Sequence, residues 1–195
     1  MKLIWKYLII IVTSLLLSII LTGINMSSMR QTNWSSNGSW KFSLAIGSDL
    51  ADLYTRAAVA KAGLFALNHQ EVIYYISQDD NAGAPLNSSC KYRIEGEDIP
   101  ARWWSITAYG DDHFLIDNKY NRYSYNYLNL AREDDNSYII HLSPYETEGN
   151  WIPLQKSSTF SIILRLYLPA KEVYENTDTI QLPQIIKEDC DEKMG

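Results

Sequence analysis

The sequence is poor in the residues that build metal clusters. Its 195 residues include only two cysteines, Cys90 and Cys190, and three histidines, His69, His113 and His141. No Cys-x-x-Cys pair and no His-Glu-x-x-His pattern occurs in it. The common structural and catalytic zinc motifs are therefore excluded, and we predict neither a metal centre nor a cofactor.

Basic charge is also scarce. Seventeen Lys and Arg residues stand against 23 Asp and Glu residues, for a net charge of -6 and a pI near 5.0. Because nucleic-acid binding needs a concentrated basic surface, we exclude nucleic acid as a partner. The phosphate-binding loop, the dinucleotide fingerprint and the Gly-x-Ser-x-Gly nucleophile motif are missing too, so no motif identifies a reaction.

The two cysteines leave the question of a disulfide open. Cys190 lies in an acidic stretch with few apolar residues, which predicts a mobile acidic tail over residues 183–195. A disulfide between Cys90 and Cys190 would tie this tail to the rest of the chain. Two separate thiols are an equal alternative.

A long apolar run stands at the N-terminus. Residues 7–24 contain no charged side chain and would span roughly 27 Å as a helix, close to the thickness of a bilayer core. Lys2 and Lys6 precede this transmembrane helix and predict that residues 1–6 stay in the cytoplasm, with the C-terminal part exported. An uncleaved anchor fits best, and a cleaved signal peptide is the alternative.

A short linker and one folded domain follow the apolar run. Residues 25–39 are rich in Ser, Asn and Met and predict a linker, and residues 40–182 predict a β-rich domain. Residues 48–67 carry an apolar stripe at helical spacing, which predicts one helix packed on a sheet. The stripe consists of Leu50, Leu53, Ala57, Ala60, Leu64 and Leu67.

Downstream of the helix the apolar pattern alternates. Strands are predicted over residues 71–77, 90–95, 103–109, 137–143 and 158–168, with turn-forming residues between them. Short strands with frequent turns are typical of an antiparallel β-sandwich or jelly-roll-like fold. The predicted fold class is therefore mainly β, with one packed N-terminal α-helix and an N-terminal transmembrane helix.

Several motifs of the β-rich part resemble one known family. They are Ala101-Arg-Trp-Trp-Ser105, Arg122-Tyr-Ser124, Asn150-Trp-Ile-Pro153 and Leu164-Arg-Leu-Tyr-Leu-Pro169. In this order they resemble the family named domain of unknown function 1214, over about residues 40–169. The resemblance implies a bacterial, envelope-located β-domain, and therefore a single-pass inner-membrane protein with a periplasmic domain. Longer members carry a second domain ahead of this one.

The resemblance implies no catalytic residues. It does reveal one departure, because members usually have Asp-Gly in the turn where this chain has Asp112-His113. Asp111, Asp112 and His113 could together ligate a metal, but adjacent residues on an exposed turn rarely converge on one ion. We therefore interpret this cluster as a turn.

Alternation along two strands predicts a polar-aromatic sheet face. Trp103 and Tyr109 share one side of their strand, Arg165 and Tyr167 share one side of another, and His141 is expected to join them if the strands are neighbours. Such a face suits a sugar ring or another polar ligand. The full set of candidate binding residues is Trp103, Tyr109, Arg122, His141, Arg165 and Tyr167. The alternative is that Arg165 pairs with a carboxylate such as Glu71 while the tyrosines only cover the sheet.

Three functions remain open from the sequence. A non-enzymatic binding or interaction module, contacting an envelope glycan or protein, fits best. A hydrolase or isomerase acting on a small polar or carbohydrate-like substrate would use Glu71, His141 and Arg165. A purely structural accessory protein is the third.

Overall fold

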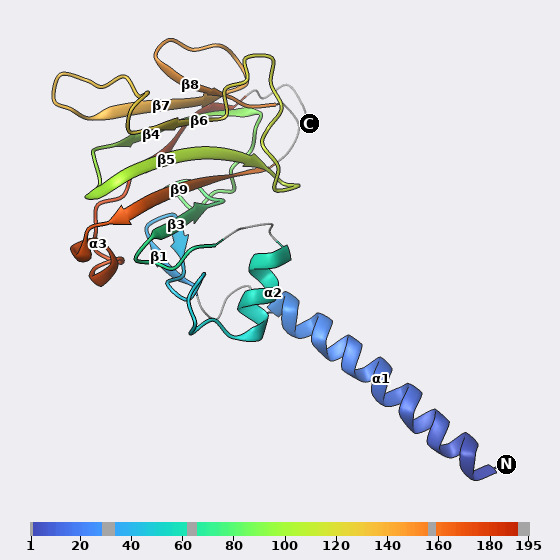
Figure 1. The fold of residues 1–195 in the computed structure, drawn as a ribbon. Coiled ribbons are helices and arrows are strands. Elements are labelled where there is room, and N and C mark those ends of the chain that lie inside the picture. Colours follow the sequence, from blue (N-terminus) through green and yellow to red (C-terminus); the bar gives the residue numbers. More distant parts are fainter. Residues whose placement is uncertain (1, 29–33, 62–65, 156–158, 191–195) are drawn as a thin grey trace.

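The protein is a β-sandwich preceded by a long N-terminal helix (Figure 1). A computed structural model describes residues 2–28, 34–61, 66–155 and 159–190. The six-stranded sheet has the order β1 (Ser35–Asn37), β2 (Trp40–Phe42), β3 (Val72–Ser77), β9 (Phe160–Pro169), β5 (Ala101–Gly110), β6 (Ser124–Asn126). The four-stranded sheet has the order β10 (Gln184–Cys190), β4 (Cys90–Gly96), β7 (Tyr138–Ser143), β8 (Asn150–Pro153).

Alternation along the strands places the core between the two sheets. Trp104 and Ile106 of β5 are fully buried, as are Leu164 of β9 and Ile140 and Leu142 of β7, and all five belong to one apolar cluster. Residues of both sheets therefore face each other, as in other sandwiches. The mainly β fold class is confirmed.

The long central strands lie where the alternation predicts them. The predicted strands 71–77, 90–95, 103–109, 137–143 and 158–168 correspond to β3, β4, β5, β7 and β9. The expectation of purely antiparallel pairing is wrong at one place, because β7 and β8 run parallel. Four short strands, β1, β2, β6 and β8, were too brief to give an alternating pattern.

The predicted helix is present but shorter. It forms α2 (Leu53–Lys61), and Asp52 caps it by accepting hydrogen bonds from the backbone N–H groups of Tyr54 and Thr55, both at 2.8 Å. The predicted packing stripe is wrong, because Leu50 and Leu53 are 88% and 83% exposed. Ala60 and Leu67 of the same stripe are exposed as well, whereas Leu64 lies outside the described residues.

A different side of this segment meets the sheet. Val59 and Ala66 pack against a small cluster formed by Ile46, Val72 and Tyr74, on the outer face of β3. Val59 and Ala66 each precede a stripe position by one residue, so the contacting side is rotated by roughly 100° from the prediction. The positions of the leucines do not reveal the contacting side, because Leu50 and Leu53 point away from the sheet.

Both predicted flanks of the domain need correction. Ser35–Asn37 of the predicted linker pairs with β2 as strand β1, so the sandwich begins before residue 40. The predicted mobile tail is wrong over Gln184–Cys190, which pairs with β4 as β10. A disulfide joins Cys90 to Cys190, which closes the question left by the sequence. Ile185 is fully buried in the core and gives this acidic strand its apolar anchor.

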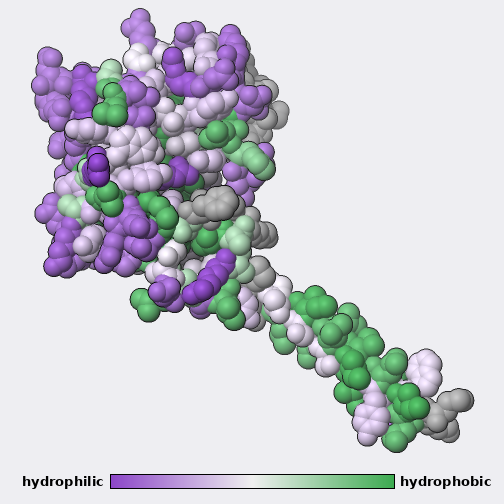
Figure 2. All heavy atoms as spheres, in the orientation of Figure 1, coloured by the Kyte–Doolittle hydropathy of each residue, from purple (hydrophilic) through white to green (hydrophobic). Residues whose placement is uncertain are grey.

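The N-terminal helix α1 (Lys2–Ser28) is long and apolar enough to cross a membrane. Its apolar part, Leu3–Ile24, has a mean hydropathy of 2.5 and is not buried against the rest of the protein. Figure 2 shows mostly hydrophobic residues along the visible face of this helix, while the sandwich surface in this view is mostly hydrophilic. The helix is consistent with a single-pass anchor or a signal sequence. A short helix, α3 (Lys171–Glu175), follows β9.

Candidate functional site

The outer face of the six-stranded sheet carries a half-buried arginine among tyrosines. Arg165 of β9 lies opposite Ser105 of β5, and its side chain extends along the neighbouring strand. Its Nη2 donates a 2.9 Å hydrogen bond to the hydroxyl of Tyr109, and its Nη1 lies 3.5 Å from the hydroxyl of Thr107. The guanidinium carbon also stands 5.4 Å from the centroid of the Tyr109 ring. These contacts fix the orientation of the guanidinium.

An aromatic pair lies next to the arginine on the same face. Trp103 and Tyr167 are directly opposite in the β5–β9 register, and their rings meet edge to face with centroids 5.1 Å apart. Tyr74 of β3 is opposite Arg165 on its other side. Burial raises the pKa of the Tyr74 phenol and outweighs the charge of Arg165, which acts to lower it. Tyr74 is therefore neutral at physiological pH.

Trp103, Tyr109, Arg165 and Tyr167 therefore form one continuous surface, which we name the Arg165 face. Each of the four side chains is half-buried, so none is sealed in the core. A guanidinium has five N–H donors, and within the described residues the Arg165 contacts engage only two of its nitrogens. The remaining N–H groups are available to an acceptor that approaches from solvent.

His141 does not belong to this surface. It lies on β7 of the other sheet, paired with Arg93 of β4 and Trp151 of β8. Its neighbours Ile140 and Leu142 point into the core, as do Leu164 and Leu166 on either side of Arg165. His141 and Arg165 therefore point out of opposite sides of the sandwich, and the expectation that they share a face is wrong.

Glu71 gives no support to a catalytic group either. It directly precedes β3, and its backbone carbonyl accepts a 2.7 Å hydrogen bond from the N–H of Leu168. Among the described residues, the Arg165 side chain contacts Tyr109 and Thr107 rather than this carboxylate. Glu71, His141 and Arg165 are not assembled into one site.

Arg122 lies in a different polar-aromatic group. Its guanidinium carbon is 5.8 Å from the ring centroid of Trp151, and Tyr120 meets the same ring at 4.9 Å. Trp151 is buried and belongs to β8 of the four-stranded sheet. Arg122 is exposed, so it covers Trp151 from the solvent side. It remains a candidate contact, separate from the Arg165 face.

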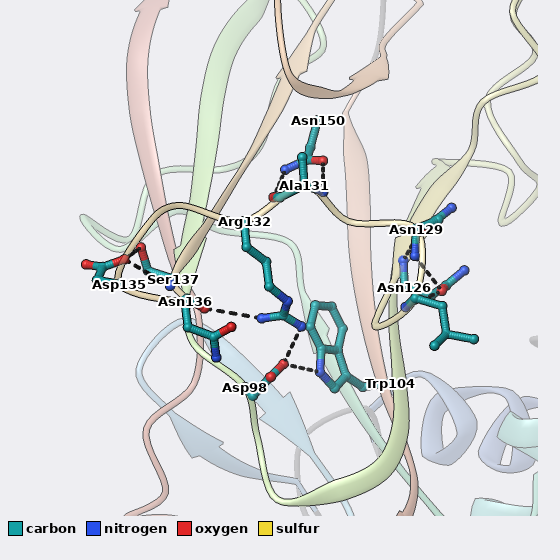
Figure 3. Close-up of polar contacts among 11 residues, drawn as sticks. Asp98, Trp104, Asn126, Asn129, Ala131, Arg132, Asp135, Asn136, Ser137 and Asn150 are labelled. Atoms are coloured by element: carbon teal, nitrogen blue, oxygen red, sulfur yellow. Dashed lines mark hydrogen bonds and ion pairs between the residues drawn. The ribbon is translucent and has the colours of Figure 1, made fainter.

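The Asn150-Trp151 motif is a structural anchor. The Asn150 side chain is 6% exposed, accepts a hydrogen bond from the N–H of Ala131 at 2.8 Å and donates to the carbonyl of Ala131 at 2.7 Å (Figure 3). It also donates to the carbonyl of Ile139 at 2.8 Å. Trp151 donates its indole N–H to the carbonyl of Ser143 at 3.0 Å. These bonds join the loop after β6 to β7 and β8.

A second buried indole is satisfied by an ion pair. Asp98 accepts hydrogen bonds from Arg132 at 2.8 Å and from the indole N–H of Trp104 at 3.2 Å (Figure 3). Trp104 is fully buried, so its N–H needs this partner. Trp104 lies on the core side of β5, whereas its partner Asp98 lies on a loop, where no periodicity in the sequence reveals it.

The comparisons with known proteins concern this same β-rich part. The model of a family described as Protein of unknown function (DUF1214) matches residues 71–171, which is just over half of the chain. The chain belongs to the DUF1214 family. This confirms the family resemblance found in the motifs, although residues 40–70 lie outside the matched range. No curated protein matches this sequence.

One solved structure has a similar fold, and a second match is weaker. The VPA0106 protein from Vibrio parahaemolyticus is 25% identical with a TM-score of 0.59, over 71% of this chain and 36% of that one. An uncharacterized protein from Burkholderia cenocepacia is 16% identical with a TM-score of 0.42, over 64% of this chain and 31% of that one. This chain thus spans about a third of the length of either protein.

The turn of this DUF1214 domain that holds His113 is a structural feature. The Gly110 N–H bonds to the carbonyl of Phe114 at 2.9 Å, and Asp112 accepts from the Phe114 N–H at 2.9 Å. His113 has a φ of 67°, in the left-handed region where glycine is favoured. Within the described residues, no group of three or more His, Cys, Asp or Glu side chains could hold a metal ion.

One cleft of about 550 Å³ opens at the end of the sandwich, between the 95–100 loop, the start of β7 and residues 180–184. Glu95, Glu97 and Asp98 line it, and two of these acids pair with an arginine, Glu95 with Arg93 at 2.7 Å and Asp98 with Arg132 at 2.8 Å. The lining of this cleft is therefore acidic, and its charge is only partly compensated. Its character differs from that of the Arg165 face, where the guanidinium meets only neutral groups among the described residues.

Proposed function

We propose that this DUF1214 protein is a membrane-anchored, non-enzymatic binding module of the bacterial envelope, and that the Arg165 face recognises an anionic glycan. The observation that carries the proposal is the arginine held by Tyr109 on an outward, half-buried face beside the Trp103–Tyr167 pair. Aromatic rings offer apolar surface to the C–H faces of sugars, and a guanidinium pairs with a carboxylate in two parallel hydrogen bonds.

Two features support the envelope location. Helix α1 has the length and composition of a membrane span, and Lys2 and Lys6 at its start favour a cytoplasmic N-terminus. The Cys90–Cys190 disulfide suits an oxidising compartment such as the periplasm, where disulfides persist. Together they favour a periplasmic sandwich on an inner-membrane anchor.

The enzyme alternative has less support. The three residues that it requires are divided between two sheets, with His141 and Arg165 on opposite sides of the sandwich. General acid–base chemistry needs its groups within hydrogen-bond reach of one substrate. A binding role needs only the Arg165 face as it stands.

The test is a titration of the full chain, held in lipid nanodiscs, with a short galacturonate oligosaccharide. Calorimetry should detect binding, and Arg165→Gln should weaken it about tenfold or more, because one bidentate charge-assisted contact is lost. The matched control is Arg102→Gln, which changes an exposed arginine of β5 on the strand side opposite to Trp103. Equal affinity for the two variants, or no binding by the unmodified chain, would reject the proposed site.

A further inference from the structure

The segment around α2 exposes leucines that the fold itself does not cover. Leu50 and Leu53 are among the most exposed large apolar side chains of the sandwich part, and Leu67 is 47% exposed. Gly47 approaches the backbone carbonyl of Leu67 so closely that a Cβ at position 47 would clash with it. The turn before α2 and the chain after it therefore lie side by side. We name residues 44–61 and 66–67 the α2 lobe.

Two charged side chains close to these leucines, Asp52 and Arg56, are engaged within the lobe, while the exposed Asp49 stands next to Leu50. Asp52 accepts hydrogen bonds from the first backbone amides of α2. Arg56 donates from Nε to the carbonyl of Ala51 at 2.9 Å and from Nη2 to that of Asp49 at 3.3 Å. Since these polar groups are already paired, the lobe can present Leu50 and Leu53 to an apolar environment at a reduced desolvation cost. The hydrogen bonds of Asp52 and Arg56 thus hold the backbone that carries the exposed leucines.

The α2 lobe lies close in the chain to helix α1, and this position indicates which surface can cover its leucines. Helix α1 ends at Ser28, and Trp34 already packs against the cluster that also holds Val59 and Ala66 of the lobe. The stretch from Ser28 to Trp34 reaches at most about 20 Å when fully extended. If α1 spans a bilayer, the lobe is therefore tethered at the surface of that same bilayer. Figure 1 shows α2 at the side of the domain from which α1 departs.

We infer that the α2 lobe docks on the outer surface of the membrane that holds α1, with Leu50 and Leu53 inserted among the lipids. Exposed leucines next to a membrane anchor gain more by entering the bilayer interface than by facing water. The docking would fix the orientation of the sandwich, and it places Tyr167, which also packs against the lobe cluster, on the membrane-proximal part of the Arg165 face. This inference rests on the anchoring of α1 that the proposed function includes.

Photo-crosslinking to lipid tests the docking. Benzoyl-phenylalanine replaces Leu53 in the full chain, which is reconstituted in phosphatidylcholine–phosphatidylglycerol nanodiscs and irradiated, and lipid adducts are measured by mass spectrometry. The matched control carries the probe at Leu128, which is 78% exposed on the loop after β6 and far in sequence from the lobe. Both sites are solvent-facing leucines, so neither substitution threatens folding. We expect about tenfold more lipid adduct at position 53 than at position 128.

A third probe separates the inference from its premise. At Leu16, in the middle of α1, the probe reports whether the helix is in the bilayer. Strong lipid labelling at 16 and 53 but not at 128 supports docking. Labelling at 16 with equal, weak labelling at 53 and 128 overturns the docking and leaves the anchor intact. Protein–protein adducts in place of lipid adducts at 53 also overturn it, because a second copy would then cover the lobe. Absence of labelling at 16 overturns both the anchor and the docking.

Discussion

Cys90 and Cys190, one hundred residues apart in the sequence, are joined by a disulfide across the pair of strands β4 and β10. The two residues are directly opposite in the register, so the bond closes the last pair of the ladder. It fastens an edge strand of acidic composition that few apolar contacts hold, with Ile185 as its buried anchor. We therefore expect the attachment of the C-terminal strand to depend on oxidation of the two cysteines.

Replacing both cysteines by serine should lower the free energy of unfolding by about 2–5 kcal/mol, because the crosslink restricts a long loop of the unfolded chain. Chemical denaturation followed by circular dichroism measures the loss. The unmodified protein in excess reductant should unfold at the same denaturant concentration as the double variant. A double variant as stable as the oxidised protein would show that β10 needs no crosslink.

The Asn150 side chain should contribute strongly to stability. Asn150→Ala leaves two carbonyls and one N–H of neighbouring backbone without their partner, and we expect a loss of about 2–3 kcal/mol. The matched control is Asn129→Ala, since Asn129 accepts one hydrogen bond in an exposed turn. Thermal denaturation of both variants measures the difference. Similar melting temperatures for the two would contradict the anchoring role of the motif.

The conformation of His113 should lower the stability of the protein. Its positive φ is strained for a residue with a Cβ and is natural for glycine, so His113→Gly should stabilise the protein by up to about 1 kcal/mol. Asp111→Gly, in the same exposed turn, serves as the control and should not stabilise it. Denaturant midpoints provide the measurement. A destabilised His113→Gly variant would mean that the imidazole makes a contact that outweighs the strain.

Two buried tyrosines should make stability fall at alkaline pH. Burial raises the pKa of Tyr75 and of Tyr138 far above the ordinary value of 10.0, and the nearby Asp98 carboxylate adds to the effect at Tyr138. Their folded pKa lies above the unfolded one, so the unfolded state loses these protons first. The stabilisation is complete below pH about 10 and decreases as the pH rises further.

An alkaline titration that follows tyrosinate absorbance and circular dichroism together tests this. The last tyrosines should ionise only when the β-sheet signal disappears, and Tyr75→Phe should remove part of that late step. Tyr127→Phe, at an exposed position, is the matched control and should leave that late step unchanged. Complete ionisation of all tyrosines in the folded protein would contradict the burial of these phenols.

Alternation predicted the centre of the sandwich well and its edges poorly. Long strands such as β5 and β9 show their two faces directly, because Trp104 and Leu164 point inward while Trp103 and Arg165 point outward. The sequence shows no alternating pattern over β10, because its solvent side is acidic and only Ile185 is fully buried. Alternation does not encode which sheet a strand joins, so it cannot separate His141 from Arg165, although the two residues lie in different sheets.

The central claim is that the Arg165 face selects an anionic glycan. The most direct test compares the dissociation constants of the full chain for a galacturonate oligosaccharide and for a neutral galactose oligosaccharide of the same length. We predict about a tenfold preference for the anionic sugar, and a ratio near one for Arg165→Gln, which keeps the aromatic surface but loses the charge. A preference that Arg165→Gln leaves unchanged, or no preference in the unmodified chain, would contradict the account.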